Sequence, residues 1–145
     1  MAGTGQVVDV GGRRLRLTNL DKVLYPEAGT TKAEVIDYYS RIADVLLPHV
    51  RNRLITRKRW PHGVESTPFF EKNVPESAPD WIRRHGIQHS ERVINYAMAD
   101  DRATLVWLAQ MAVLEIHTPQ WRLPMGPGGA PMANRNARKL LQELK

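Results

Sequence analysis

The sequence contains no cysteine and no long apolar run. Without thiols, the chain has no disulfide framework and no thiolate ligands for zinc. No apolar stretch approaches the roughly 18 residues that a membrane-spanning helix requires. The first residues, M-A-G-T-G-Q, have neither the basic nor the apolar region of a secretory signal. These absences predict a cytoplasmic protein of bacterial type that does not enter membranes.

Signatures of several enzyme classes are absent as well. The chain has no Gly-x-x-x-x-Gly-Lys-Ser/Thr loop for phosphates and no Gly-x-Ser-x-Gly elbow of a serine hydrolase. The only adjacent acids are Asp100 and Asp101. In a strand they would point to opposite faces, and just before a helix either is better suited to capping it than to binding metal. Glu115 and His117 would share one face of a strand, but no third ligand is anchored to them, so we predict no metal site.

The positive charge is concentrated in a few places. The chain has a net charge of +6, and residues 51–60, R-N-R-L-I-T-R-K-R-W, hold five basic side chains and no acid. Residues 132–145 hold four basic side chains and one acidic one. A focused basic patch attracts polyanions, most commonly nucleic acid, although a solvated surface explains such a run equally well. Leu54 and Ile55 interrupt the basic residues, which indicates an ordered strand.

The pattern of the first 50 residues predicts a hairpin followed by a helix. The 145 residues and the hydrophobic fraction of 42% are typical of one domain with its own core. Apolar and polar residues alternate on both sides of Gly11-Gly12, as in a β-hairpin. Thr31 and Glu34 form a Thr-x-x-Glu capping box, so we expect a helix to begin there and to end at Pro48.

The remaining elements complete the expected fold. Strands are expected at 54–60, 69–72, 87–89, 93–97 and 114–117, with one or two helical turns at 79–84. A second long helix over 101–113 would be capped by Asp100 or Asp101. Together these elements predict an α/β fold of the α+β two-layer kind, with a mainly antiparallel sheet packed by two long helices. Residues 1–123 would form the domain, 124–135 a Gly/Pro-rich linker and 136–145 a short basic helical tail.

Three groups of residues are candidates for binding a ligand. The segment from Asn19 to Lys32 places lysines around a helix N-terminus, where free N–H groups favour phosphate. Phe69 and Phe70 follow the basic strand, and one that is exposed could stack on a base, although packing under a neighbouring loop is the more common arrangement. His117 near a strand end could meet a nucleotide, although such a histidine is more often a satisfied core residue.

Five segments occur together in a fixed order. They are L-T-N-L-D-K-V-L-Y-P-E-A-G-T-T-K at 17–32, T-R-K-R-W-P-H-G-V at 56–64, F-F-E-K at 69–72, S-A-P-D-W at 77–81 and L-E-I-H-T-P-Q-W-R at 114–122. Together these segments resemble the polymerase domain of bacterial DNA ligase D. That domain is the end-joining polymerase of the archaeo-eukaryotic primase superfamily. The resemblance covers roughly residues 14–123, and it implies a truncated primase-polymerase-like fold.

The resemblance implies a role for each matching residue. Asn19, Lys22 and Lys32 match a pocket that grips the 5′-phosphate at a DNA gap or break. Lys58 and Arg59, with Arg57 beside them, match basic residues near the nucleotide and template. Phe69 and Phe70 match aromatic residues that contact bases at the templating position, and His117 matches a histidine that helps to position the incoming nucleotide.

One departure from the family limits the expected activity. The family continues into a strand that ends Asp-x-Asp-Pro, whose aspartates bind the metals of two-metal phosphoryl transfer. This sequence has no aspartate after Asp101. We therefore expect no cofactor and no polymerase activity from this chain alone, although the intact family is a nucleotidyltransferase that uses manganese or magnesium.

The expected function is binding of 5′-phosphorylated DNA ends or gaps in non-homologous end joining. One alternative is a part of an active polymerase that a second chain completes, and another is the inactive product of a disrupted gene. The expected partners are DNA with a 5′-phosphate, a nucleotide, the end-joining Ku protein and a complementary polymerase or ligase chain. The expected location is the bacterial nucleoid.

Overall fold

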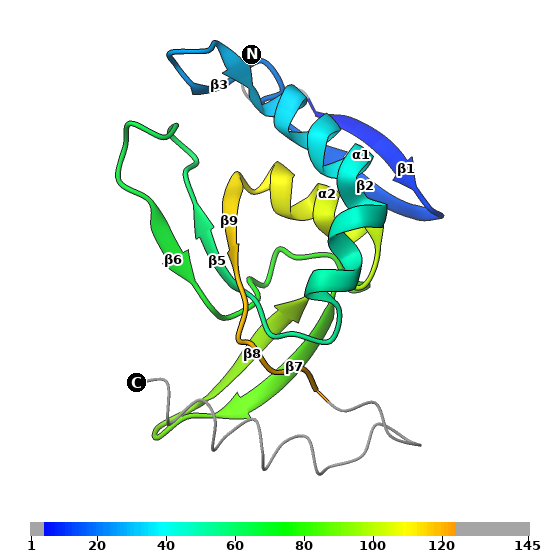
Figure 1. Cartoon of the computed structure of the whole chain (residues 1–145), viewed down its shortest axis with the longest axis vertical. Coiled ribbons are helices and arrows are strands. Elements are labelled where there is room, and N and C mark those ends of the chain that lie inside the picture. The colour runs from blue at the N-terminus through cyan, green and yellow to red at the C-terminus, as the bar shows by residue number, and fades with distance from the viewer. Residues whose placement is uncertain (1–4, 124–145) are drawn as a thin grey trace.

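The computed structural model describes residues 5–123, and all of its strand pairings are antiparallel. Two helices pack against each other between small sheets, with the β1-β2 hairpin on one side and the sheet of order β6-β5-β9 on the other (Figure 1). In chain order the elements are β1 Gln6–Val10, β2 Arg13–Leu17, β3 Val23–Tyr25, β4 Thr30–Thr31, α1 Lys32–Val50, β5 Thr56–Arg59, β6 Phe69–Glu71, β7 Arg83–Gln88, β8 Val93–Met98, α2 Arg102–Gln110 and β9 Val113–His117. This arrangement confirms the predicted α+β class.

The predicted single sheet is divided in the structure. The described residues form one three-stranded sheet and three two-stranded sheets. Isolated bridges from Ile55 to Ala97 and from Asn73 to Tyr96 connect the β5-β6 region to the β7-β8 hairpin. The linker and the basic tail expected beyond residue 123 lie outside the described residues. No helix within residues 5–123 is long and apolar enough to cross a membrane.

Helix α1 begins as predicted but ends later. Thr31 and Glu34 exchange the two hydrogen bonds of a capping box. The helix continues through Pro48 to Val50, so the predicted end at Pro48 is wrong. Proline removes only its own N–H from the last turn, and Arg51 N still donates to Leu47 O at 2.9 Å. Arg122 Nη2 donates to Pro48 O at 2.8 Å, which satisfies one terminal carbonyl.

Helix α2 is shorter than expected. Asp101 is its N-cap, and Asp101 Oδ1 accepts hydrogen bonds from the N–H and the hydroxyl of Thr104. The other carboxylate oxygen accepts from Arg13 Nε at 2.8 Å. The helix ends at Gln110 rather than 113 because Ala112 has a φ of 58°, in the left-handed region that turns the chain into β9.

The helical turns expected at 79–84 are only partly present. Residues 80 and 81 lie in a turn, and β7 already begins at Arg83. Six residues of β7 pair with β8, from Arg83 opposite Met98 to Gln88 opposite Val93. Arg83 also bonds Asp100 at 2.6 Å. This tertiary pairing outweighs the local preference for a helical turn.

The core forms between the helices and the sheets. Its fully buried members come from loops and strands as well as both helices. A main cluster includes Leu24, Ile55, Leu105, Leu108 and Val113, and a smaller one lies beside the β7-β8 hairpin. The packing places the end of β2, the start of α1, the end of α2 and the end of β5 around one cavity.

Candidate nucleic-acid interface

The basic strand β5 presents its side chains to two opposite faces of the β6-β5-β9 sheet. Successive residues in a strand alternate between faces. Lys58 is paired with Phe70 on one side and with Glu115 on the other, so these three side chains lie on one face. Arg59 belongs to the other face, with Arg57. The predicted pair Lys58 and Arg59 is therefore divided between two clusters. We call the cluster that contains Arg59 the phosphate cavity, and the cluster that contains Lys58 the outer face.

The phosphate cavity has a volume of about 360 Å³. It brings together the three residues expected to grip a 5′-phosphate, Asn19, Lys22 and Lys32, and adds Arg59 from β5. The remaining lining residues are Thr18, Leu24, Pro61, His62, Gln110, Met111 and Ala112. Three cationic side chains, two from the segment 19–32 and one from β5, thus border one open cavity, which suits an anion.

Lys32 is the most unusual of these cations. It is the first residue of α1 and is only 6% exposed. Burial and the nearby charges of Lys22 and Arg59 lower the pKa of its ammonium group to about 8. Within the described part of the chain, Lys32 forms no ion pair with a carboxylate. A bound anion would supply the charge that this site lacks.

The backbone of the cavity wall is fixed by specific hydrogen bonds. Asn19 has a φ of 54°, and Lys22 N closes the turn on Asn19 O at 3.1 Å. Lys32 N donates to Lys22 O at 2.8 Å, which joins the turn to the start of α1. Gln110 exchanges two bonds with Thr18, at 2.9 and 2.7 Å, and so anchors the residue before Asn19 to the end of α2. No sequence pattern indicates Gln110, because 92 positions separate it from Thr18.

The outer face combines a cation, aromatic rings and a histidine. Lys58 Nζ lies 5.0 Å from the ring centre of Phe70 and 5.1 Å from that of Trp60. His117 lies 5.9 Å from Phe70, between ring centres, and its Nε2 lies 2.8 Å from Glu115 Oε1. Lys58 Nζ and Glu115 Oε1 are 3.9 Å apart. These groups offer both a stacking surface and a charge for a polynucleotide.

Both phenylalanines of the edge strand β6 are exposed, so neither face of this strand is covered at these positions. Phe69 is 48% exposed and Phe70 is 62% exposed, so neither packs under a neighbouring loop. They point to opposite faces of the sheet. Phe70 joins Lys58 and His117, whereas Phe69 is paired with Arg59. Large exposed aromatic side chains beside cations are typical of surfaces that bind single-stranded or splayed bases.

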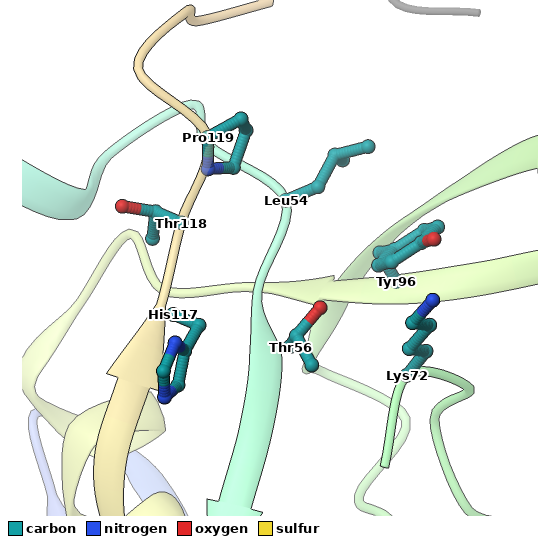
Figure 2. A pocket seen from close by; sticks show the side chains of 7 residues that line it. All are labelled: Leu54, Thr56, Lys72, Tyr96, His117, Thr118 and Pro119. Carbon is teal, nitrogen blue, oxygen red and sulfur yellow. The ribbon is translucent and has the colours of Figure 1, made fainter. Parts of the chain in front are cut away.

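A second cavity of about 210 Å³ borders the outer face. His117 of β9 and Thr56 of β5 lie side by side at its wall, and Lys72 and Tyr96 close the opposite side (Figure 2). Leu54, Thr118 and Pro119 complete the lining. His117 is exposed and faces this space, so it is not a satisfied core residue.

Part of the basic stretch 51–60 serves the fold rather than a surface. Arg57, expected beside Lys58 and Arg59 on the DNA surface, is 0% exposed. Its guanidinium lies 5.6 Å from the Trp107 ring centre and donates to Asn73 O at 2.6 Å. Arg53 Nη1 donates to the carbonyls of Pro119 and Gln120. The expected surface role of Arg57 is therefore wrong.

No metal centre is formed by the described residues. Among residues 5–123, no three His, Cys, Asp or Glu side chains come together to bind an ion. Glu115 and His117 bond each other at 2.8 Å and provide at most two ligands. These residues alone do not fit a two-metal site, which needs several carboxylate ligands.

Comparison with known proteins agrees with this arrangement. The family model described as "LigD, primase-polymerase domain" matches residues 31–138. The multifunctional non-homologous end joining protein LigD of Mycolicibacterium smegmatis is 53% identical over 116 residues, covering 80% of this chain and 15% of the relative. The LigD of Mycobacterium tuberculosis is 45% identical over 132 residues, covering 91% of this chain and 17% of the relative.

A solved structure gives the same result for the fold. It is described as the polymerase domain from Mycobacterium tuberculosis ligase D in complex with DNA. The match has a TM-score of 0.75 and 49% identity, and it covers 79% of this chain and 40% of that chain. The curated relatives are much longer than this chain, which spans about a sixth of their length.

The fold matches part of a primase-polymerase domain. The chain belongs to the LigD primase-polymerase domain family. The expected family and fold are confirmed. The roles of Asn19, Lys22 and Lys32, and of Lys58, Arg59, Phe69, Phe70 and His117, stay predictions.

Proposed function

We propose that this chain binds 5′-phosphorylated DNA ends or gaps during repair of double-strand breaks by non-homologous end joining. The observation that supports this best is the phosphate cavity, which Lys22, Lys32 and Arg59 border. Within residues 5–123, no carboxylate is ion-paired to the buried Lys32. A terminal phosphate carries about two negative charges and several acceptor oxygens, which match these donors. The related domain whose solved structure includes DNA supports DNA as the ligand.

The outer face would contact the rest of the DNA. Phe70 offers an exposed ring for stacking, and Lys58 offers a charge to the backbone. His117, beside the second cavity, would bind an incoming nucleotide if one is used. Binding of Ku and of a complementary polymerase or ligase chain, and location at the nucleoid, are part of the same proposal.

Fluorescence anisotropy with gapped duplexes tests this function. Two duplexes identical except for the 5′-phosphate at the gap are titrated with the wild-type chain and with Lys22→Ala plus Lys32→Ala. We expect the wild type to prefer the phosphorylated duplex by about tenfold or more, from at least one charge-assisted hydrogen bond. The double variant should bind both duplexes equally. Equal binding by the wild type would contradict the proposal.

A second candidate is one part of a template-dependent polymerase. The observation that favours it is the share of the solved polymerase domain that this chain matches, 40%. Further sequence would then supply the metal-binding aspartates, since no aspartate follows Asp101. Primer extension with manganese distinguishes the candidates: we expect none from this chain alone, and extension on adding the other part of the domain would establish the second. The disrupted-gene alternative predicts neither extension nor phosphate preference.

A further inference from the structure

Glu71 of the edge strand β6 lies between two arginines of β5. Its Oε1 accepts a hydrogen bond from Arg59 Nη1 at 2.7 Å, and its Oε2 lies 3.5 Å from Arg57 Nη1. Arg59 lines the phosphate cavity, whereas Arg57 is in the core. One carboxylate therefore connects the interior of the domain to the cavity wall.

The buried partner makes this arrangement expensive for the fold. Among the described residues, Arg57 Nε and Nη1 have no hydrogen-bond partner. Burial lowers the pKa of Arg57, opposed by the charge of Glu71. A buried ion pair is seldom more stable than apolar residues of similar size, and its best-attested value is in fixing a geometry. The geometry fixed here is that of Glu71 and, through it, Arg59.

The second constraint on Arg59 comes from the end of α2. Arg59 Nε donates to Met111 O at 2.9 Å. With Glu71 on Nη1, the guanidinium is bonded on two sides by elements that are far apart in the sequence. Its planar fork is therefore pre-oriented before any ligand arrives, which lowers the entropy lost on binding.

We propose that Glu71 is a positioning residue for 5′-phosphate recognition, holding Arg59 at the wall of the phosphate cavity and joining that cavity to the strand that bears Phe70. This inference depends on the proposed function. Glu71 does not line the cavity, and it acts through Arg59. Phosphate recognition and the aromatic strand β6 are thereby connected by one ion-paired side chain.

Simple electrostatics predicts the opposite effect of removing Glu71. An acid next to an anion site repels the anion, so neutralising it should strengthen phosphate binding. Positioning predicts that the loss of Glu71 weakens the preference for phosphate, because Arg59 is no longer held. The sign of the change therefore distinguishes the two explanations.

The experiment measures the ratio of dissociation constants for gapped duplexes without and with the 5′-phosphate. The full chain is compared with Glu71→Gln, Glu71→Ala, Arg59→Ala and the double variant Arg59→Ala plus Glu71→Ala. We expect the ratio to fall about threefold in Glu71→Gln, which keeps an acceptor oxygen, and about tenfold in Glu71→Ala. The double variant should lose no more than Arg59→Ala alone, because Glu71 acts through Arg59.

Asp21 provides the control for charge. It is exposed beside Lys22 and does not line the cavity. Asp21→Asn removes the same charge, and we expect it to leave the ratio unchanged or to raise it. If Glu71→Ala fails to fold because Arg57 is left without its carboxylate, Glu71→Gln decides the question, with folding checked by circular dichroism.

Each outcome has a definite meaning. A ratio in Glu71→Gln that is unchanged or higher than in the wild type would overturn the positioning role and leave the proposed function standing. Losses from Arg59→Ala and Glu71→Ala that add in the double variant would also overturn it. A wild-type chain without any phosphate preference would overturn the proposed function and this inference together.

Discussion

Lys58 and Arg59 are adjacent in β5, yet Lys58 lies over the Phe70 ring on the outer face while Arg59 borders the phosphate cavity. A polynucleotide bound at both places would therefore pass around an edge of the β6-β5-β9 sheet, with its terminal phosphate on one face and its bases on the other. The two clusters should make separable contributions to binding. Phosphate recognition should depend on Lys22, Lys32 and Arg59, and general affinity should depend on Lys58 and Phe70.

Lys58→Ala should weaken binding to phosphorylated and unphosphorylated duplexes alike. Lys58 is on the outer face and does not line the phosphate cavity. Loss of one phosphate contact reduces the slope of log affinity against log salt by about 1. Titrations at several salt concentrations measure this slope. A loss confined to the phosphorylated duplex would contradict the separation of the clusters.

Phe70→Ala should weaken DNA binding more than Phe69→Ala does. Phe70 is the more exposed ring and shares its face with Lys58 and His117, whereas Phe69 points to the other face. A stacked base is worth about 1–3 kcal/mol. Anisotropy with a gapped duplex compares the matched variants, and Phe70→Leu retains apolar contact without the ring. Equal losses from the two alanine variants would show that the face of the sheet does not decide the contact.

The phosphate preference should decline as the pH rises above about 8. Burial, Lys22 and Arg59 lower the pKa of Lys32 to about 8, so the free chain loses the Lys32 charge above that pH. A bound phosphate requires the charged form, and binding must then take up a proton. The ratio of affinities measured from pH 7 to 9.5 tests this. Lys32→Arg, which stays charged, should flatten the profile, and an identical decline in that variant would contradict the assignment.

Lys32→Met should stabilise the free chain while it abolishes phosphate preference. The folded state lowers the pKa of Lys32, so between about pH 8 and 10.5 the unfolded chain binds more protons and stability rises with pH. Below pH 8 the full cost of the buried charge is present. Its removal should add roughly 1–3 kcal/mol at pH 7. Urea unfolding measures the gain, and Lys22→Met, at a less buried position, should give a smaller one.

The sequence was most informative where neighbours in the chain are also neighbours in space. The Gly11-Gly12 hairpin and the Thr31 capping box depend on residues three or four apart, and both are confirmed. The burial of Arg57 was not predictable, because its partners Asn73 and Trp107 belong to distant segments. The same holds for Gln110, whose contact with Thr18 exists only once α2 packs against the first hairpin.

The candidate site was also predictable where it depends on neighbouring residues and not where it depends on distant ones. The segment 19–32 indicated a phosphate site through local chemistry alone, and the structure brings Asn19, Lys22 and Lys32 to one cavity. Whether Arg59 lines this cavity depends on which face of β5 its side chain occupies and on the position of that strand beside the end of α2. Local sequence also could not show that Pro48 would remain helical, since Arg122 supports its carbonyl from 74 positions away.

The most direct test of the phosphate cavity observes its lysines while DNA binds. The chain with isotope-labelled lysine side chains is titrated by nuclear magnetic resonance with gapped duplexes that differ only in the 5′-phosphate. We predict that the ammonium signals of Lys22 and Lys32 shift only with the phosphorylated duplex, while Lys58 shifts with both. Equal shifts of Lys32 with the two duplexes, or none with either, would contradict the account.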